Sequence, residues 1–197
     1  MSSFQIYSLT DYIHRDVSEK KFLFDSNVWL YILQPQKDKL TKEQLAYEDF
    51  FYEISQRAEI VVPFPLLSEV INTYLYKITL GEFIDQRGDR KENAREYHYL
   101  KYKFRISSKY REDQKRLFES LIIYLRSCDV ITENIDPALI SQKLLNFPPV
   151  LPDFNDNYYY HLAKNNNYII VTHDGDFLVK DVEIVTLNGY LLRKAKS

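Results

Sequence analysis

The sequence predicts an α/β fold with three layers, in which helices cover both faces of a central parallel sheet of about five strands. Short apolar runs of strand length alternate with longer stretches whose apolar residues recur at helical spacing. A chain of 197 residues can form one domain with a sizeable core, and 45% hydrophobic and 27% charged residues are ordinary for a folded protein. We find no internal repeat and no low-complexity tract.

The first predicted elements are a polar arm, a strand and a short helix. Residues 1–20 are weakly patterned, and we expect an arm or a short helix there. The apolar run over 21–25 ends in an acid, which is typical of a buried parallel strand that enters a helix. Ser26 or Asn27 can cap that helix, which we expect over 28–33.

A helix, a second strand and another helix follow. Residues 41–57 place apolar side chains close to one helical face, and 58–63 form the next apolar run. Pro65 suits the first turn of a helix over roughly 66–79, and Gly81 marks its expected end.

The middle of the chain contains a basic insertion. We expect residues 77–116 to be helical in parts and to interrupt a single domain that covers 21–197. From Asp85 to Arg116 there are 11 Lys and Arg against 6 Asp and Glu, although the whole chain has a net charge of -2. The rest of the chain is therefore acidic, which suits a protein that binds cations in one place and polyanions in another.

The remaining segments continue the alternation of helix and strand. We expect helices over 114–127, 136–145 and 153–164, strands over 128–131, 168–172 and 183–187, and a rigid extended loop over 147–152. Strands that alternate with helices predict a parallel sheet with helices on both faces.

The sequence favours a cytoplasmic protein that does not bind membranes. No apolar run approaches the ~20 residues that span a bilayer, and the N-terminus lacks a basic stretch followed by an apolar core. Cys128 is the only cysteine, so no intrachain disulfide can form, and we expect it to be a buried apolar residue.

Several acids follow a predicted strand or lie in the first turns of a predicted helix. They are Asp25, Glu69, Asp153, Asp156, Asp174 and Asp176. Because ligands of parallel sheets bind beyond the carboxyl ends of the strands, we expect these acids to gather there. Carboxylates that gather raise each other's pKa unless a cation lies among them. Their oxygen atoms suit a hard divalent cation, so the sequence predicts an Mg²⁺ or Mn²⁺ site.

Each acid taken alone also has an ordinary structural explanation. Asp25 can cap a helix, and Glu69 can be a solvated side chain near a helix N-terminus. Asp153 and Asp156 can form a capping arrangement, and Asp174 can belong to a polar turn. Only the joint placement of these acids favours a metal site.

The motifs that contain these acids resemble the PIN domain family, best known from the toxin ribonucleases of bacterial toxin–antitoxin pairs (VapC-type). The segments 25–27 (Asp-Ser-Asn) and 68–70 (Ser-Glu-Val) resemble the first two motifs of that family. Asp156, which opens a helix, resembles the third, and 172–177 (Thr-His-Asp-Gly-Asp-Phe) resembles the last. The resemblance covers roughly residues 21–187.

The chain departs from the family pattern at two places. Residues 77–116 make it longer than a compact toxin. Tyr158, Tyr159, Tyr160 and His161 replace the usual alanines, and the bulky tyrosines alter the helix behind the site.

The resemblance implies metal-dependent endonucleolytic cleavage of RNA, with Mg²⁺ or Mn²⁺ as the cofactor. The expected catalytic and metal-binding acids are Asp25, Glu69, Asp156 and Asp174. Further ligands, or residues that orient ligands, are Asp153 and Asp176. Supporting hydrogen bonds are expected from Ser26, Asn27 and Thr172. His173 is expected to be an exposed turn residue, with proton transfer as the alternative role.

The basic segment is expected to bind the phosphate backbone of a nucleic acid, with Tyr97, Tyr99 and Tyr102 stacking on unpaired bases. The cationic candidates are Arg87, Arg90, Lys91, Arg95, Lys101, Lys103 and Arg105. A solvated helix face is the alternative explanation of the same pattern.

Three functions remain open from the sequence. The first is a ribonuclease of this type, as the toxin of a pair with a cognate antitoxin and with homodimerisation by family analogy. The second is a non-catalytic PIN-like module that binds RNA or serves as a scaffold. The third is a nucleotide- or phosphate-processing enzyme, which the absence of a Gly-rich phosphate loop disfavours.

Overall fold

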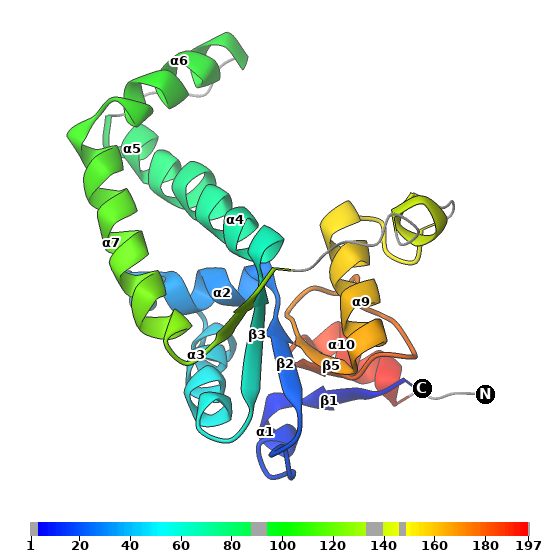
Figure 1. Cartoon of the computed structure of the whole chain (residues 1–197). Coiled ribbons are helices and arrows are strands. Elements are labelled where there is room, and N and C mark those ends of the chain that lie inside the picture. Colours follow the sequence, from blue (N-terminus) through cyan, green and yellow to red (C-terminus); the bar gives the residue numbers. More distant parts are fainter. Residues whose placement is uncertain (1–3, 88–93, 133–139, 146–148, 197) are drawn as a thin grey trace.

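The computed structural model describes residues 4–87, 94–132, 140–145 and 149–196. Its centre is a six-stranded sheet in which all paired strands are parallel (Figure 1). In spatial order the strands are β1 (Ile6–Ser8), β6 (Ile184–Thr186), β5 (Tyr168–Val171), β2 (Lys21–Phe24), β3 (Glu59–Pro63) and β4 (Asp129–Ile131). The predicted α/β fold with a parallel sheet is confirmed.

Helices connect these strands along the chain. Those of the first half are α1 (Leu9–Tyr12), α2 (Ser26–Leu33), the 3-10 turn η1 (Lys37–Lys39), α3 (Lys42–Ser55), α4 (Phe64–Thr73), the π-helical η2 (Tyr74–Thr79) and α5 (Leu80–Arg87). Those of the second half are α6 (Ala94–Arg105), α7 (Ser108–Leu125), the π-helical η3 (Ile140–Leu144), α9 (Phe154–Asn166) and α10 (Gly189–Ala195).

Apolar side chains pack on both faces of the sheet. In β5, Ile169 and Val171 belong to the larger core cluster, which also includes residues of α2, α3, α4 and α7. Ile170, between them, belongs to a second cluster that includes Leu191 of α10. Since alternate residues of a strand point to opposite faces, the sheet is the middle layer of three.

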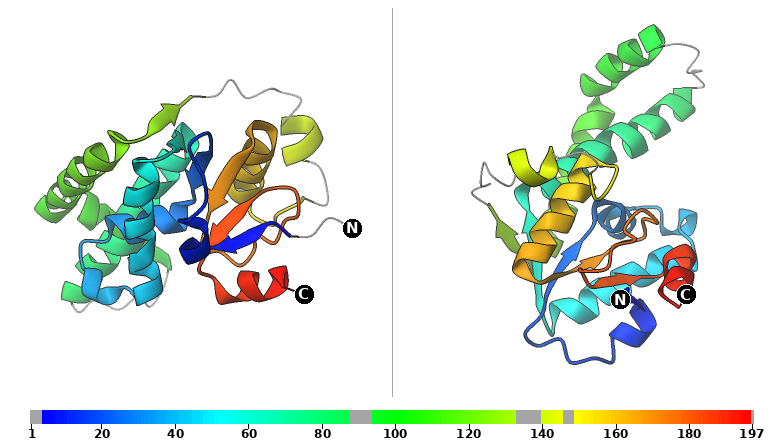
Figure 2. Two further views of the ribbon diagram at one scale, coloured as in Figure 1. Left: turned by 90° about the horizontal axis from the view of Figure 1, so that it is seen from below. Right: turned by 90° about the vertical axis from the view of Figure 1, so that its right-hand side faces the viewer.

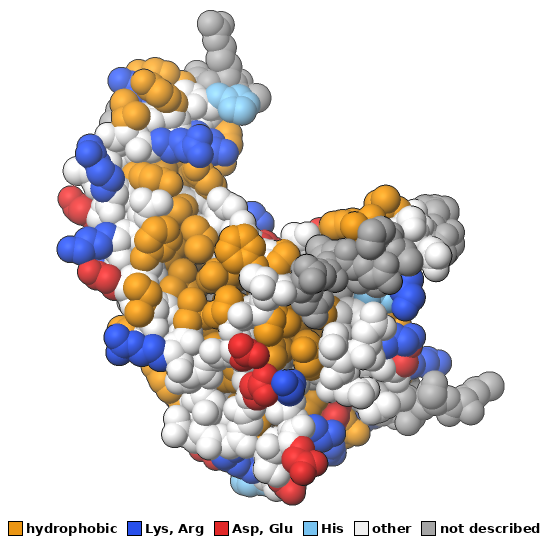
Figure 3. All heavy atoms as spheres, viewed as in Figure 1, with side chains coloured by type: hydrophobic (Ala, Val, Ile, Leu, Met, Phe, Trp, Pro, Cys, Tyr) orange, Lys and Arg blue, Asp and Glu red, His pale blue; other side chains and the backbone are white. Residues whose placement is uncertain are grey.

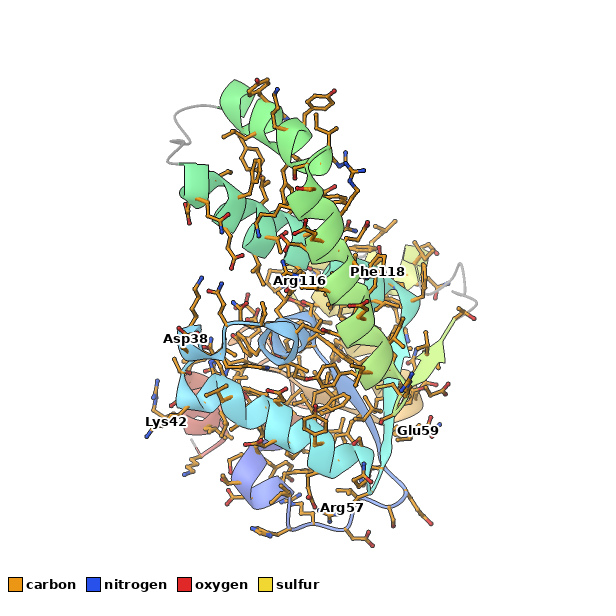
Figure 4. The ribbon with its side chains drawn as sticks, turned by 90° about the vertical axis from the view of Figure 1, so that its left-hand side faces the viewer. Asp38, Lys42, Arg57, Glu59, Arg116 and Phe118 are labelled. Carbon is orange, nitrogen blue, oxygen red and sulfur yellow. The ribbon has the colours of Figure 1, made fainter. Side chains whose placement is uncertain are left out.

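The edge strand β1 was not predicted from the sequence. It has only three residues and, among the described strands, pairs only with β6, so it has little of the periodicity that identifies a longer strand. Arg57 holds the following segment in place by donating hydrogen bonds to the carbonyls of Ile13 and Arg15 (Figure 4). The segment expected as an arm or short helix therefore contains a sixth strand as well as the short helix α1.

One predicted helix boundary was wrong, and the structure decides between alternatives at another. The helical path does not end at Gly81, because α4, η2 and α5 follow one another without a break to Arg87. Gly81 has no atom within 4 Å of a built Cβ, so neither crowding nor a left-handed backbone requires glycine there. Asp25 caps α2 by accepting a hydrogen bond from the Ser26 amide, so of the residues that the sequence offered as a cap it is Asp25, and not Ser26 or Asn27, that takes this role.

The described residues of the basic segment form a helical arm. Figures 1 and 2 show α5, α6 and the start of α7 extending away from the sheet. The arm has its own small apolar cluster, which contains Leu80, Ile84, Leu100 and Phe104.

Part of the helix predicted over 136–145 and part of the loop predicted over 147–152 lie outside the described residues. No helix in the described part of the chain is long and apolar enough to cross a membrane.

Candidate metal centre

Asp25 is the buried centre of the candidate site. It follows β2 directly, and because Phe24 pairs with Val171 of β5, the next residues Asp25 and Thr172 are neighbours. Asp25 Oδ2 accepts hydrogen bonds from Thr172 Oγ1 and Asn27 Nδ2, both at 2.7 Å. Asp25 Oδ1 accepts one from the Ser26 amide at 2.6 Å. The three residues predicted to support the site, Ser26, Asn27 and Thr172, thus all donate to the same carboxylate.

Burial raises the pKa of Asp25 to about 6, although these hydrogen bonds lower it. The charges of Glu69 and Asp174 add to the rise. Asp25 is therefore an acid whose charged form lacks a compensating cation among the described residues.

Asp174 is joined to Asp25 through Thr172. The Asp174 amide donates to Thr172 Oγ1 at 2.9 Å, and this hydroxyl itself donates to Asp25. Asp174 Oδ1 accepts a hydrogen bond from the amide of Asp176 at 2.9 Å. Asp176 is exposed, so its backbone orients Asp174 while its own carboxylate lies in solvent.

Glu69 connects α4 to α9. Its Oε2 accepts hydrogen bonds from Asn155 Nδ2 at 2.9 Å and from Tyr159 OH at 3.0 Å. Glu69 is only partly buried, and these two donors were not predicted from the sequence. An acid on one helix and a tyrosine 90 positions later give no local signal that they are partners.

Asp153 and Asp156 have different roles in the first turn of α9. Asp153 caps the helix, because its side chain accepts hydrogen bonds from the amides of Asn155 and Asp156. The pKa of Asp156 is raised to about 8 by burial and then by the charges of Asp25, Asp153, Asp174 and Glu69, in that order. The sequence analysis expected that acids gathered in this region would raise each other's pKa, and the shift of Asp156 has this cause in part.

The donor atoms of this site fit a hard divalent cation. All are carboxylate oxygens, as Mg²⁺ and Mn²⁺ prefer. In the described part of the chain, however, no three His, Cys, Asp or Glu side chains lie close enough to hold one ion. Burial and the charges of the other four carboxylates raise the pKa of Asp156, although the side chains do not form a closed metal site among the described residues.

His173 is packed among aromatic rings and is not simply exposed. Its Nδ1 lies 3.0 Å from Tyr47 OH, and its carbonyl accepts a hydrogen bond from Asn188 Nδ2 at 2.7 Å. The rings of Tyr31 and Tyr47 meet it edge-on. The expectation of an exposed turn histidine was wrong, because residues distant in sequence cover the ring.

A cleft among the described residues lies away from this group of acids. It has a volume of about 770 Å³ and is lined by residues of α2, η2, α5 and α7, including Arg116 (Figure 4). Its charged groups are already paired, since Asp113 interacts with Lys109 and Arg116, and Lys109 also with Glu82. A cleft with internally paired charges is a weaker candidate for catalysis than the group of unpaired acids.

The predicted nucleic-acid-binding residues are only partly described. Lys101 lies over the Tyr76 ring at 4.2 Å and Lys103 over the Tyr99 ring at 5.3 Å. Arg105 lies over the Tyr76 ring at 5.4 Å. Residues 90 and 91 and the side chains of residues 87 and 95, all predicted to bind nucleic acid, lie outside the described part.

The tyrosines of α6 differ in exposure. Tyr99 and Tyr102 are 57% and 60% exposed, whereas Tyr97 packs against the small cluster of the arm. Figure 1 places α6 at the end of the arm, away from the strand ends that contain the acids. The arm and the acids are therefore separate features of the molecule.

A family model for the PIN domain matches residues 22–183. The chain belongs to the PIN domain family. PIN domains are generally nucleases, and the acids described above are the features of this PIN domain that suit such chemistry.

This PIN domain protein is similar to the crystal structure of PAE2754 from Pyrobaculum aerophilum, with a TM-score of 0.46 and 13% sequence identity over 94% of this chain and 96% of that chain. No curated protein matches it.

Proposed function

We propose that this PIN domain protein is an Mg²⁺- or Mn²⁺-dependent endoribonuclease. The observation that carries the proposal is the raised pKa of Asp156, to about 8, in a group of five carboxylates. Repulsion among these carboxylates lowers the stability of the folded protein unless a bound cation neutralises them.

The acids Asp25, Glu69, Asp156 and Asp174 would hold the ion or ions. Asp153 and Asp176 would act as additional ligands or would orient ligands through water. A bound divalent cation supplies nucleophilic hydroxide near neutral pH and neutralises charge on the phosphate during in-line attack.

The chain's own groups would prepare the site for this chemistry. Asp156 would release its proton when the ion binds, because the cation removes the repulsion that favours the protonated form. Thr172, Asn27 and the Ser26 amide would keep Asp25 in one orientation, so that no side-chain freedom is lost on binding.

The arm would bind the RNA outside the cleavage site. Lys101, Lys103 and Arg105 would contact phosphates, and exposed Tyr99 and Tyr102 would stack on unpaired bases. Recognition of unpaired bases favours a single-stranded substrate.

The test is cleavage of single-stranded RNA by the purified protein. We expect cleavage with Mn²⁺ or Mg²⁺, none with EDTA, and none with Asp25→Asn. Asp181→Asn is a matched control, because Asp181 pairs with Lys164 and is not among the groups that raise the pKa of Asp156. Intact RNA with wild-type protein and metal would refute the nuclease proposal, and RNA binding retained under those conditions would support a non-catalytic module.

The toxin role is a further part of the proposal, with a cognate antitoxin or a second copy of the chain as protein partner and a cytoplasmic location. Phe118 and Ile122 of α7 and Val130 of β4 are 41%, 55% and 42% exposed. Figure 3 shows a broad apolar area on the face that includes α4, α7 and β4, and Figure 4 shows Phe118 on the opposite side of α7 from Arg116. Exposed apolar patches of this kind are typical of protein-binding surfaces.

Expression in cells tests the toxin role. We expect growth arrest with the wild-type chain and normal growth with Asp25→Asn. Growth arrest that is equally strong with both proteins would contradict a nuclease toxin.

A further inference from the structure

Two side chains of α9 donate hydrogen bonds to the same oxygen of Glu69. Asn155 Nδ2 lies 2.9 Å and Tyr159 OH lies 3.0 Å from Glu69 Oε2. The two donors are four residues apart, and so they lie on one face of the helix. No described residue donates a hydrogen bond to Oε1, the other oxygen of the carboxylate.

The position of the Tyr159 hydroxyl is determined by the core. The side chain is only 1% exposed, and its ring meets that of Tyr158 with a centroid distance of 5.3 Å. The Tyr159 hydroxyl donates its hydrogen bond to Glu69 Oε2. A buried hydroxyl without an acceptor would be costly, and Glu69 provides the acceptor.

We propose that Tyr159, assisted by Asn155, is a positioning residue that holds Glu69 by Oε2 and leaves Oε1 as the oxygen that binds a divalent cation. This inference rests on the proposed metal-dependent function. It assigns a role to the tyrosine run that departs from the family's usual alanines.

The physical reason is the loss of side-chain freedom on metal binding. A free glutamate must be ordered when it becomes a ligand, which weakens binding, whereas a glutamate already held by two donors has less freedom to lose. Removing a residue that forms a hydrogen bond with a metal ligand typically weakens metal affinity by about 10- to 100-fold. Tyr159 also links Glu69 to α9, the helix that Asp153 caps and that contains Asp156, so these acids keep a defined separation.

The next tyrosine on the same helix is a matched control. Tyr160 OH donates to both carboxylate oxygens of Asp181, at 2.9 and 3.0 Å. It belongs to the second core cluster, and Asp181 is not among the acids that raise the pKa of Asp156. Tyr160→Phe therefore removes the same hydroxyl-to-carboxylate bond from the same helix without changing Glu69.

The experiment measures Mn²⁺ binding by isothermal titration calorimetry. The proteins are wild type, Tyr159→Phe, Tyr160→Phe and Asn155→Ala. We expect Tyr159→Phe to weaken Mn²⁺ binding by about tenfold, Asn155→Ala to weaken it by a smaller factor, and Tyr160→Phe to stay within about twofold of wild type. In RNA cleavage, Tyr159→Phe should need more Mn²⁺ for half-maximal rate and should recover at saturating Mn²⁺.

The outcomes separate this inference from the function on which it rests. If wild type binds Mn²⁺ and Tyr159→Phe binds it equally well, the positioning role is wrong and the metal site stands. If wild type itself binds no Mn²⁺, the proposed function fails and the inference fails with it. Should Tyr159→Phe not fold, Asn155→Ala decides, because Asn155 is exposed and its unchanged affinity would overturn the proposal.

Discussion

Replacing Asp156 by Asn should stabilise the protein in the absence of metal. The pKa of Asp156 rises from an ordinary 3.8 to about 8. Each unit of pKa difference between folded and unfolded chains is worth about 1.4 kcal/mol, which sets an upper limit of about 6 kcal/mol. Because Asp156 is partly exposed and solvent screens its interactions, we expect about 2 kcal/mol.

The sign of the pH dependence follows from the direction of the shift. Above pH 3.8 the unfolded chain releases the proton of Asp156, whereas the folded chain retains it up to about pH 8. The folded state therefore loses stability as pH rises between these values, and the loss is complete above about pH 8. The asparagine amide in the variant has no proton to release, so the advantage of Asp156→Asn should grow across the same interval.

Urea denaturation in EDTA at pH 5, 7 and 9 measures this effect. The gap between Asp156→Asn and wild type should be small at pH 5 and reach about 2 kcal/mol at pH 9. Asp176→Asn is the control, since Asp176 is exposed and is not among the charges that raise the pKa of Asp156, and it should change stability by less than ~0.5 kcal/mol. A destabilising Asp156→Asn at pH 9, or a gap that does not vary with pH, would refute the reasoning.

Three further predictions concern other parts of the molecule. Thr172→Val removes the hydroxyl that donates to Asp25 and accepts from the Asp174 amide, so Mn²⁺ affinity in calorimetry should fall by about tenfold; unchanged affinity would contradict this role. His161 is buried, no described residue forms a hydrogen bond with either ring nitrogen, and burial lowers its pKa below 6.5, so stability should fall as pH drops below 6.5. His161→Phe should reduce this acid sensitivity in urea denaturation between pH 7 and 5, and an equally acid-sensitive variant would exclude His161 as its source. Replacing Lys101, Lys103 and Arg105 together by Ala should weaken RNA binding and lower the salt dependence of log K by about 2 in fluorescence anisotropy; an unchanged slope would place the RNA elsewhere.

The placement of Asp25 and Asp174 just beyond neighbouring strands was predictable because local sequence marks it. An apolar strand followed by Asp25, and another followed by Thr172 and Asp174, identify strand ends that a parallel sheet brings together. The different roles of the two acids at the start of α9 were predictable in part. Asp153 caps the helix, as expected of an acid at this position, whereas Asp156 interacts with the charges of the other acids.

Other features could not be predicted because they depend on contacts between distant segments. The hydrogen bond from Tyr159 to Glu69, the aromatic contacts of His173 and the π-helical η2 have no periodic or motif signal. The helix boundary at Gly81 was wrong for the same reason. Glycine in a helix interior lowers helix stability by a modest free energy, and the packing of the arm outweighs this loss.

The sequence by itself determined the fold class, the family motifs and the chemical identity of the acids, because periodicity and residue type are local properties. Only the tertiary structure decided that β1 pairs with β6 and that Asp25 accepts hydrogen bonds from three donors. It also decided that a tyrosine of α9 donates a hydrogen bond to Glu69 of α4. Burial and distance between charges arise from packing, so the raised pKa values of Asp25 and Asp156 exist only in the folded chain.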